Sequence, residues 1–307
     1  MDVLTVATRG GGLAIAQTEI IISALKSTSP DIQIKIKKIT TSGDQDRRTA
    51  LWNLKTTGFF TSQVEDAMLT GEADFAVHSF KDLPTEQREG LTIAAICQRQ
   101  FAEDCLIAAA PVSSIEQLPQ TAKIGTSSLR RAAQIRRLRK DLEPVPIRGN
   151  VSTRLKKLEE GKFDAIIVAR AGLERLNLQE KISVCFNPRQ FIPAPAQGAL
   201  AVQTRSNDVA ATKLIAAIDD EKARTITLAE RKVLVTMKCG CHAPVGAFAE
   251  ILGDDIEICA FISELQGNNF IKRQIKGPVK EAEKLAEKIA NELLNAGGNQ
   301  ILENLEK

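Results

Sequence analysis

The chain is poor in the side chains that build disulfide scaffolds and aromatic stacking platforms. It has six cysteines in 307 residues, no tyrosine and one tryptophan, Trp52. Thiols this sparse do not form the disulfide framework of a small secreted domain, and they favour reduced cysteines in a cytoplasmic protein. The aromatic residues form no evident series on which the bases of a single-stranded nucleic acid could stack.

Long apolar segments are also missing. No apolar run approaches the roughly 20 residues of a membrane-spanning helix, and the opening MDVLTV lacks the basic and apolar regions of a secretory signal. We therefore expect a cytoplasmic protein with no membrane partner. The composition, 43% hydrophobic and 26% charged, is ordinary for a globular protein, and the length suggests two or three domains.

The chain does have a strong concentration of basic charge between Lys123 and Lys157. This segment carries 11 Lys or Arg and two acids, a balance of +9, whereas the whole chain sums to +3. Residues 125–131 (GTSSLRR) and 148–154 (RGNVSTR) each predict a turn that opens a helix with arginines in or beside its first turn. Free N–H groups and the helix dipole add to these guanidinium groups, so the segment predicts an anion-binding surface.

Phosphate contacts with a nucleic acid would also explain this basic segment. The nearly neutral charge of the chain as a whole argues against that class of protein.

Apolar runs alternate with helical periodicity, which predicts an α/β fold with largely parallel sheets. We expect one αβ domain from residues 1–97 with 199–216, and a second, with the basic segment, from 98–198. A small α+β domain is expected over 217–307. The strand predicted at 199–204 should return to the first domain.

The segment 78–84 (HSFKDLP) directly follows a predicted buried strand. Ligands of open αβ sheets bind beyond the carboxyl ends of strands. Lys81 and Asp82 cannot both be buried there for packing, because isolated buried charges are costly. They form either a surface ion pair or part of a site. His78 ends the strand and fits a structural histidine better than a base.

Residues 238–246 (KCGCHAPVG) bring two thiols and an imidazole together. The spacing lacks the further ligands that zinc needs, so we predict no metal. A disulfide between Cys239 and Cys241 would be strained. Two interpretations stay open. The residues form a tight turn, or Lys238 and His242 favour a nucleophilic thiolate that carries a covalent group.

Taken in chain order, these motifs resemble those of the porphobilinogen deaminase family, also called hydroxymethylbilane synthases. The resemblance covers nearly the whole chain at the family's spacing. It implies a transferase with two αβ domains like type II periplasmic binding proteins, and a small third α+β domain. The matching segments are ATR (7–9), HSFKDLP (78–84), GTSSLRR (125–131), RGNV (148–151) with Arg154, QGA (197–199) and GC (240–241).

The resemblance implies a condensation of four porphobilinogen molecules, head to tail and with loss of ammonia. The reaction would be primed by a dipyrromethane cofactor joined by a thioether to Cys241, and hydrolysis would release linear 1-hydroxymethylbilane. The enzyme would be a monomer whose partner is the small molecule porphobilinogen, with no nucleic acid. The alternative is a non-catalytic solute-binding protein of the same two-lobe architecture, which would have no use for Cys241.

The family motifs also assign roles to residues. Asp82 would be catalytic, accepting hydrogen bonds from pyrrole N–H groups and stabilising the cation left when ammonia departs. Phe60 would belong to a lid. Each pyrrole carries an acetate and a propionate, which guanidinium forks suit. The residues expected to bind cofactor and substrate are Arg9, Ser79, Lys81, Thr126, Ser127, Ser128, Arg130, Arg131, Arg148, Arg154, Arg175 and Gln197.

The chain departs from the family pattern in four places. Gly11 stands where serine is common, and Thr57 where lysine is common. Ala196 precedes Gln197 where glycine is usual. Cys239 replaces a common glycine and places a second thiol two residues from Cys241.

Overall fold

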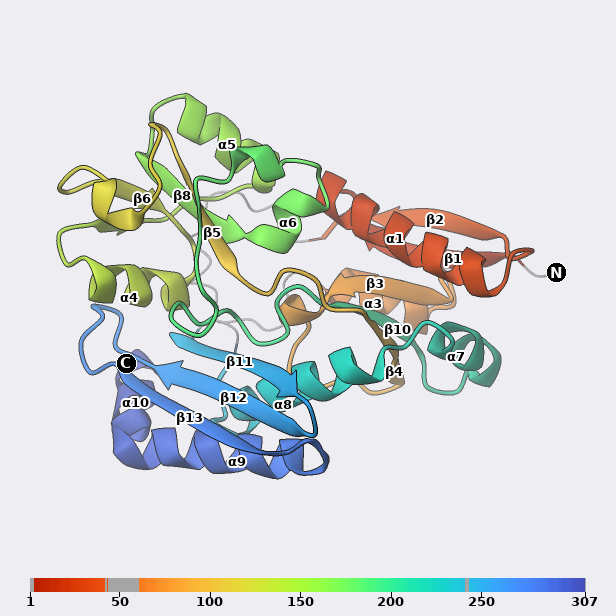
Figure 1. Ribbon diagram of the computed structural model, residues 1–307. Coiled ribbons are helices and arrows are strands. Elements are labelled where there is room, and N and C mark those ends of the chain that lie inside the picture. The colour runs from red at the N-terminus through yellow and green to blue at the C-terminus, as the bar shows by residue number, and fades with distance from the viewer. Residues whose placement is uncertain (1–2, 42, 44–60, 241–242, 307) are drawn as a thin grey trace. The chain divides into compact units, whose positions relative to one another are not determined.

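The computed structural model describes residues 3–41, 43, 61–240 and 243–306 (Figure 1). Thr57, Phe60 and Cys241, three of the positions singled out above, lie outside the described residues. The chain forms two compact units. The first takes the described parts of Met1–Arg47, Thr56–Gln100 and Gly198–Arg224, and the second takes those of Arg48–Lys55, Phe101–Gln197 and Thr225–Lys307.

The first unit is built on a five-stranded sheet of order β2-β1-β3-β10-β4. β1 pairs in parallel with β2 and β3, and β10 pairs antiparallel with β3 and β4. The distant strand β10 thus returns to the first sheet, which confirms the expectation for residues 199–204. The strands are β1 (Leu4–Arg9), β2 (Ile34–Ile39), β3 (Phe75–Ser79), β4 (Leu91–Cys97) and β10 (Leu200–Arg205).

Alternating side chains cover both faces of this sheet. Val6 of β1 packs in one cluster with Ile21 of α1, whereas its neighbour Ala7 packs in another with Val64 and Met68 of α3. Burial of each of the larger side chains, such as Val6, Ile21 and Met68, contributes about 1.5–3 kcal/mol. The helical elements of this unit are α1 (Gly12–Thr28), α3 (Ser62–Leu69), η2 (Phe80–Asp82) and α7 (Val209–Ala216).

The second unit contains another five-stranded sheet, of order β7-β6-β8-β5-β9. β6 is parallel to β7 and β8, while β5 runs antiparallel to β8 and β9. Leu106 of β5 packs with Ile135 of α4, and Ile107 packs with Leu155 of α5 in a separate cluster. The elements are β5 (Asp104–Ala108), η3 (Ile115–Gln117), β6 (Lys123–Gly125), α4 (Leu129–Leu138), β7 (Glu143–Val145), α5 (Val151–Glu159), β8 (Ala165–Ala169), α6 (Arg170–Glu174), η4 (Gln179–Lys181) and β9 (Val184–Cys185).

A three-stranded antiparallel sheet, β11-β12-β13, completes the second unit. Its core joins Val233 of α8, Ile258 of β12 and Ile289 of α9. The α8 helix starts in the first unit and continues into the second from Thr225. The elements are α8 (Glu221–Thr236), β11 (Val245–Leu252), β12 (Asp255–Ile262), β13 (Ile271–Pro278), η5 (Val279–Glu281), α9 (Ala282–Leu293), η6 (Leu294–Gly298) and α10 (Asn299–Glu306).

The α/β class, with a small α+β part near the C-terminal end, is confirmed. The three-domain boundaries stay a prediction, because the second and third sheets lie in one compact unit. Among the described residues, no helix combines the length and the apolar character needed to cross a membrane.

Candidate active site

In the first unit, Lys81 and Asp82 lie in the short helix η2, directly after β3. Phe80 is fully buried beneath this turn, and its N–H donates to the carbonyl of Ala199 at 3.1 Å. Asp82 is exposed and Lys81 is half-buried. The buried phenyl ring therefore anchors a turn whose charged residues remain accessible at the carboxyl end of the strand, where the sequence places them.

His78 lies within the core below this turn. It is 6% exposed, and burial, together with the positive charge of Arg9, lowers the pKa of its imidazole to about 4. The imidazole is therefore neutral at pH 7, in agreement with a structural histidine. The next residue, Ser79, accepts a hydrogen bond at Oγ from Nε2 of Gln17 on α1 at 2.8 Å, which ties the end of β3 to that helix.

In the second unit, hydroxyl groups shape the turn between β6 and α4. Thr126 is fully buried, and its Oγ1 accepts the N–H of Ser128 at 3.2 Å. The hydroxyl of Ser127 donates to the carbonyl of Ile147. Ser128 caps α4, because its Oγ accepts the N–H of Arg131 at 3.4 Å. The small polar residues of this motif thus set the position at which the arginines enter the helix.

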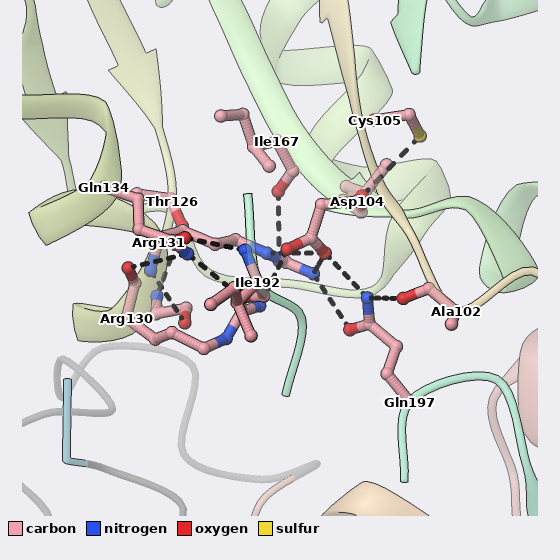
Figure 2. A network of polar contacts seen from close by, with 12 residues as sticks. Ala102, Asp104, Cys105, Thr126, Arg130, Arg131, Gln134, Ile167, Ile192 and Gln197 are labelled. Carbon is pink, nitrogen blue, oxygen red and sulfur yellow. Dashed lines mark hydrogen bonds and ion pairs between the residues drawn. The ribbon is translucent and has the colours of Figure 1, made fainter. Parts of the chain in front are cut away.

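Arg130 and Arg131 lie on the first turn of α4 and are 3% and 6% exposed. Both contact Asp104, a fully buried residue at the start of β5 (Figure 2). Nη2 of Arg130 lies 2.8 Å from Oδ2 of Asp104. Nη2 and Nε of Arg131 lie 2.7 and 3.1 Å from Oδ1. One carboxylate therefore holds two guanidinium groups side by side.

Further buried groups complete this network. Nη1 of Arg131 donates to the carbonyl of Ile167 at 3.1 Å. Nε2 of Gln197 donates to Oδ1 of Asp104 at 2.9 Å and to the carbonyl of Ala102 at 2.8 Å. Burial alone would raise the pKa of the Asp104 carboxyl, but the two guanidinium groups and Gln197 hold that pKa well below its usual range. Asp104 is therefore ionised at neutral pH.

The sequence pattern does not predict Asp104, and it predicts Arg130 and Arg131 only as partners of substrate and cofactor carboxylates. The structure gives the two arginines an internal carboxylate partner. The sequence does contain a signal for this pairing. Asp104 opens an apolar strand (DCLIAAA), and an acid buried at that position needs a counter-charge. A role of both arginines toward bound carboxylates stays a prediction.

The second basic turn opens α5 and holds two more of the predicted arginines. Gly149 has a φ of 110°, and a Cβ there would lie 2.6 Å from Cγ2 of Thr153. Asn150 caps the helix by accepting the N–H of Thr153 at 2.9 Å. Nε of Arg154 donates to the carbonyl of Gly149 at 2.9 Å, and Nζ of Lys157 donates to that of Arg148 at 3.0 Å.

Arg148, Arg154 and Arg175 differ from the first arginine pair in exposure. All three are half-buried, so part of each side chain is accessible. Arg175 directly follows α6, the helix that begins where β8 ends. These three arginines therefore come from two separate segments, the turn and first part of α5 and the end of α6.

Cys239 is half-buried and packs against the hydrophobic core of the third sheet. Its Sγ lies 3.9 Å from the carbonyl of Leu234 on α8. The thiol of Cys239, the second cysteine of the motif, is thus directed toward the protein interior. Among the residues that the structure describes, no group of three or more His, Cys, Asp or Glu side chains is arranged to hold a metal ion.

Comparison with known proteins gives two family matches. The model described as "Porphobilinogen deaminase, dipyromethane cofactor binding domain" matches residues 4–213, and the model "Porphobilinogen deaminase, C-terminal domain" matches residues 224–295. Together these two matches span most of both units.

Curated relatives carry the same name. Porphobilinogen deaminase of Natranaerobius thermophilus is 40% identical over 309 residues, covering 99% of this chain and 99% of the relative. That of Roseiflexus castenholzii is 40% identical over 299 residues, covering 97% and 98%. A solved nutrient-binding protein from Burkholderia cenocepacia, bound to methionine, is 14% identical with a TM-score of 0.45, and 72% of this chain and 93% of that chain are covered.

Proposed function

The chain belongs to the porphobilinogen deaminase family, and we propose that it is the transferase that condenses four porphobilinogen molecules, with loss of ammonia, into linear 1-hydroxymethylbilane. The observation that carries this function is the 40% identity to a curated deaminase over 99% of both chains. The non-catalytic solute-binding alternative is not favoured, because both family models describe the enzyme.

The donor set of the chain fits a dipyrromethane cofactor. Each ring of that group carries an acetate and a propionate, and the chain offers half-buried guanidinium groups at Arg9, Arg148, Arg154 and Arg175. Guanidinium forks bind carboxylates through two parallel hydrogen bonds. When bound, the cofactor supplies the terminal pyrrole carbon to which the first substrate is joined.

We assign covalent attachment to Cys241 by a thioether. Two observations support Cys241 over Cys239. The family motif GC matches at residues 240–241, and the Cys239 thiol packs against the core of the third sheet. Arg9, Ser79, Lys81, Thr126, Ser127, Ser128 and Gln197 remain assigned to cofactor and substrate binding, with the arginine set, and Phe60 remains assigned to a lid.

Asp82 is the proposed catalytic residue. Its exposed carboxylate, anchored by the buried Phe80, would accept hydrogen bonds from the pyrrole N–H of the substrate. Positive charge develops on that ring as ammonia leaves, and a fixed carboxylate stabilises it. The same carboxylate would take up the proton released when the new carbon–carbon bond forms. Lys81, its neighbour, would pair with a substrate carboxylate.

The proposed function is tested on the purified protein. Intact-mass measurement should show the chain enlarged by one dipyrromethane. When porphobilinogen is added, the protein should consume the porphobilinogen and release ammonia. A protein of unmodified mass that leaves porphobilinogen unchanged would reject this function. An unmodified protein that binds porphobilinogen without consuming it would favour the solute-binding alternative.

We also propose that the enzyme works in the cytoplasm as a monomer. Cys105, Cys185 and Cys259 are free thiols, which supports a reducing compartment. Light scattering coupled to size-exclusion chromatography should give the mass of one chain. A mass of two chains would reject the monomer.

A further inference from the structure

A second fully buried carboxylate contacts the segment of chain that carries Gln197. Glu230, on α8, is 0% exposed. Its Oε2 accepts the N–H of Ala196 at 2.7 Å, and its Oε1 accepts the N–H of Ala249 on β11 at 2.7 Å. Glu230 therefore joins α8 and the third sheet to the residue next to Gln197, all within the second unit.

The backbone at Ala196 is unusual. This fully buried residue has a φ of 61°, in the left-handed region that glycine adopts more readily. An alanine in this conformation is strained, because its Cβ lies close to the following carbonyl oxygen. The short hydrogen bond from its N–H to the Glu230 carboxylate offsets part of this strain. Glu230 on α8 thus fixes the backbone of the turn at Ala196.

Gln197, the next residue in this turn, connects it to the Asp104–Arg131 ion pair. Its amide nitrogen contacts Oδ1 of Asp104, and its Oε1 lies 3.5 Å from Nη2 of Arg131. A continuous path of buried contacts therefore runs from Glu230 through Ala196 and Gln197 to Asp104 and then to Arg131.

We propose that Asp104 is a positioning residue for Arg130 and Arg131, and that Glu230 sets the position of Asp104 through the turn at Ala196 and Gln197. This inference rests on the proposed function, because it assigns the two arginines to the carboxylates of substrate and cofactor. The two oxygens of Asp104 each take a different guanidinium group.

The physical effect of Asp104 is to hold two like charges together. Without its carboxylate, the buried guanidinium groups of Arg130 and Arg131 repel each other and separate. With it, both groups are ordered before an anion arrives, so less conformational freedom is lost on binding. The carboxylate also leaves the trio with one net positive charge, which lets an anion be bound and then displaced as the pyrrole chain grows.

The central test compares Asp104→Asn with a matched control, Asp141→Asn. Asp141 forms an exposed ion pair with Arg139, beyond the other end of α4, so the control makes the same chemical change outside the network. Four quantities are measured for each protein: the melting temperature, the fraction of chains carrying the covalent cofactor, and KM and kcat for porphobilinogen. The control should match the wild type in all four.

Asp104→Asn should raise KM or reduce the cofactor-bearing fraction by about tenfold or more, as expected when one partner of a buried charge pair is removed. The purely structural alternative predicts a lower melting temperature with an unchanged cofactor-bearing fraction and unchanged KM and kcat in the folded protein. That second result would overturn the inference.

Glu230→Gln provides an independent variant should Asp104→Asn fail to fold. A glutamine keeps the size of the side chain but replaces one of the two acceptor oxygens by a donor. It should shift KM in the same direction and by less. Wild-type KM, kcat and cofactor content in folded Glu230→Gln would reject the link through Ala196. A wild-type protein with neither cofactor nor turnover would instead reject the proposed function itself.

Discussion

The Nη2 atom of Arg131 lies 2.7 Å from Oδ1 of Asp104, and both side chains are almost entirely buried. Arginines from the basic segment therefore belong to the interior as well as to the surface. A buried ion pair must be complete to be tolerated, because either partner left alone is a desolvated charge. Arg131 thus has a structural role in addition to the ligand-binding role proposed for it.

Arg131→Met should destabilise the fold by about 3–5 kcal/mol, the cost of breaking a buried pair. The substitution removes contacts to Asp104 and leaves the carbonyl of Ile167 without its donor from Arg131. Urea denaturation measures the change. Lys37→Met, which breaks the exposed pair with Glu72, is the control and should change stability little. Equal effects of the two substitutions would contradict the prediction.

Asp82→Asn should keep the fold and the covalent cofactor but lose most of the turnover. The side chain is exposed, so its replacement removes no core contact, whereas an amide cannot stabilise the positive charge that forms as ammonia leaves. Intact mass, melting temperature and porphobilinogen consumption check the three parts. Near-normal turnover would remove Asp82 from the catalytic role.

Cys241→Ser should abolish the covalent adduct, and Cys239→Ser should retain it. The contrast follows from the contact of the Cys239 thiol with the carbonyl of Leu234 and with the third-sheet core. Intact-mass spectrometry of the two purified variants is sufficient. An adduct on Cys241→Ser that disappears only with Cys239→Ser would reverse the assignment.

Stability should fall as the pH is lowered from about 6.5 to about 4, in part because of His78. Burial lowers the pKa of His78 to about 4, whereas an unfolded histidine titrates near about 6.5. In that window the unfolded state binds a proton that the folded state does not, so protonation favours unfolding. The contribution, fully present above the unfolded pKa, amounts to about 3 kcal/mol at most.

His78→Gln removes this proton linkage and should flatten the dependence of the unfolding free energy on pH. Urea denaturation at several pH values between 7 and 4 measures the slope for both proteins. Parallel slopes would show that other groups account for the acid sensitivity. Asp104 acts at lower pH, because its depressed pKa gives stability that is lost only as the pH falls below the ordinary carboxyl range.

Gly149→Ala should destabilise the start of α5 by about 1–3 kcal/mol or more, since it combines a strained φ with a collision. The new Cβ would lie 2.6 Å from Cγ2 of Thr153, the residue capped by Asn150. Gly161→Ala is the matched control, because Gly161 also has a positive φ, 69°, but a Cβ there meets no atom within 4 Å. A melting temperature lower than that of the control isolates the collision.

The apolar run at residues 165–169 predicts a strand, and β8 occupies these residues, because few other structures bury an apolar run on both faces. The sequence pattern misses β13 (Ile271–Pro278), where Lys272, Arg273 and Gln274 interrupt the apolar pattern. That strand lies at the sheet edge with polar side chains exposed, so only Ile271 and Ile275 pack on the core. Helical periodicity predicts one helix over residues 279–295. In the structure α9 ends at Leu293, and the left-handed backbone of Gly297 separates it from α10.

Local motifs give the position of the site residues but not their burial. The turn at Thr126–Ser128 opens a helix as predicted, and Asp82 follows its strand as predicted. The burial of Arg130 and Arg131 depends on Asp104, which is 26 residues earlier in the chain than Arg130. Pairings at such a separation arise from sheet topology, and no local pattern encodes them.

The place of β10 in the first sheet has a consequence for synthesis of the chain. This strand fills the gap between β3 and β4, yet its residues, Leu200–Arg205, emerge from the ribosome about a hundred residues after β4. Until then β3 and β4 each have an edge without the partner that β10 provides. All strands of the β5–β9 sheet are already present by that time. A nascent chain can thus complete its second sheet before its first, and the half-made first sheet is the part most in need of protection from aggregation.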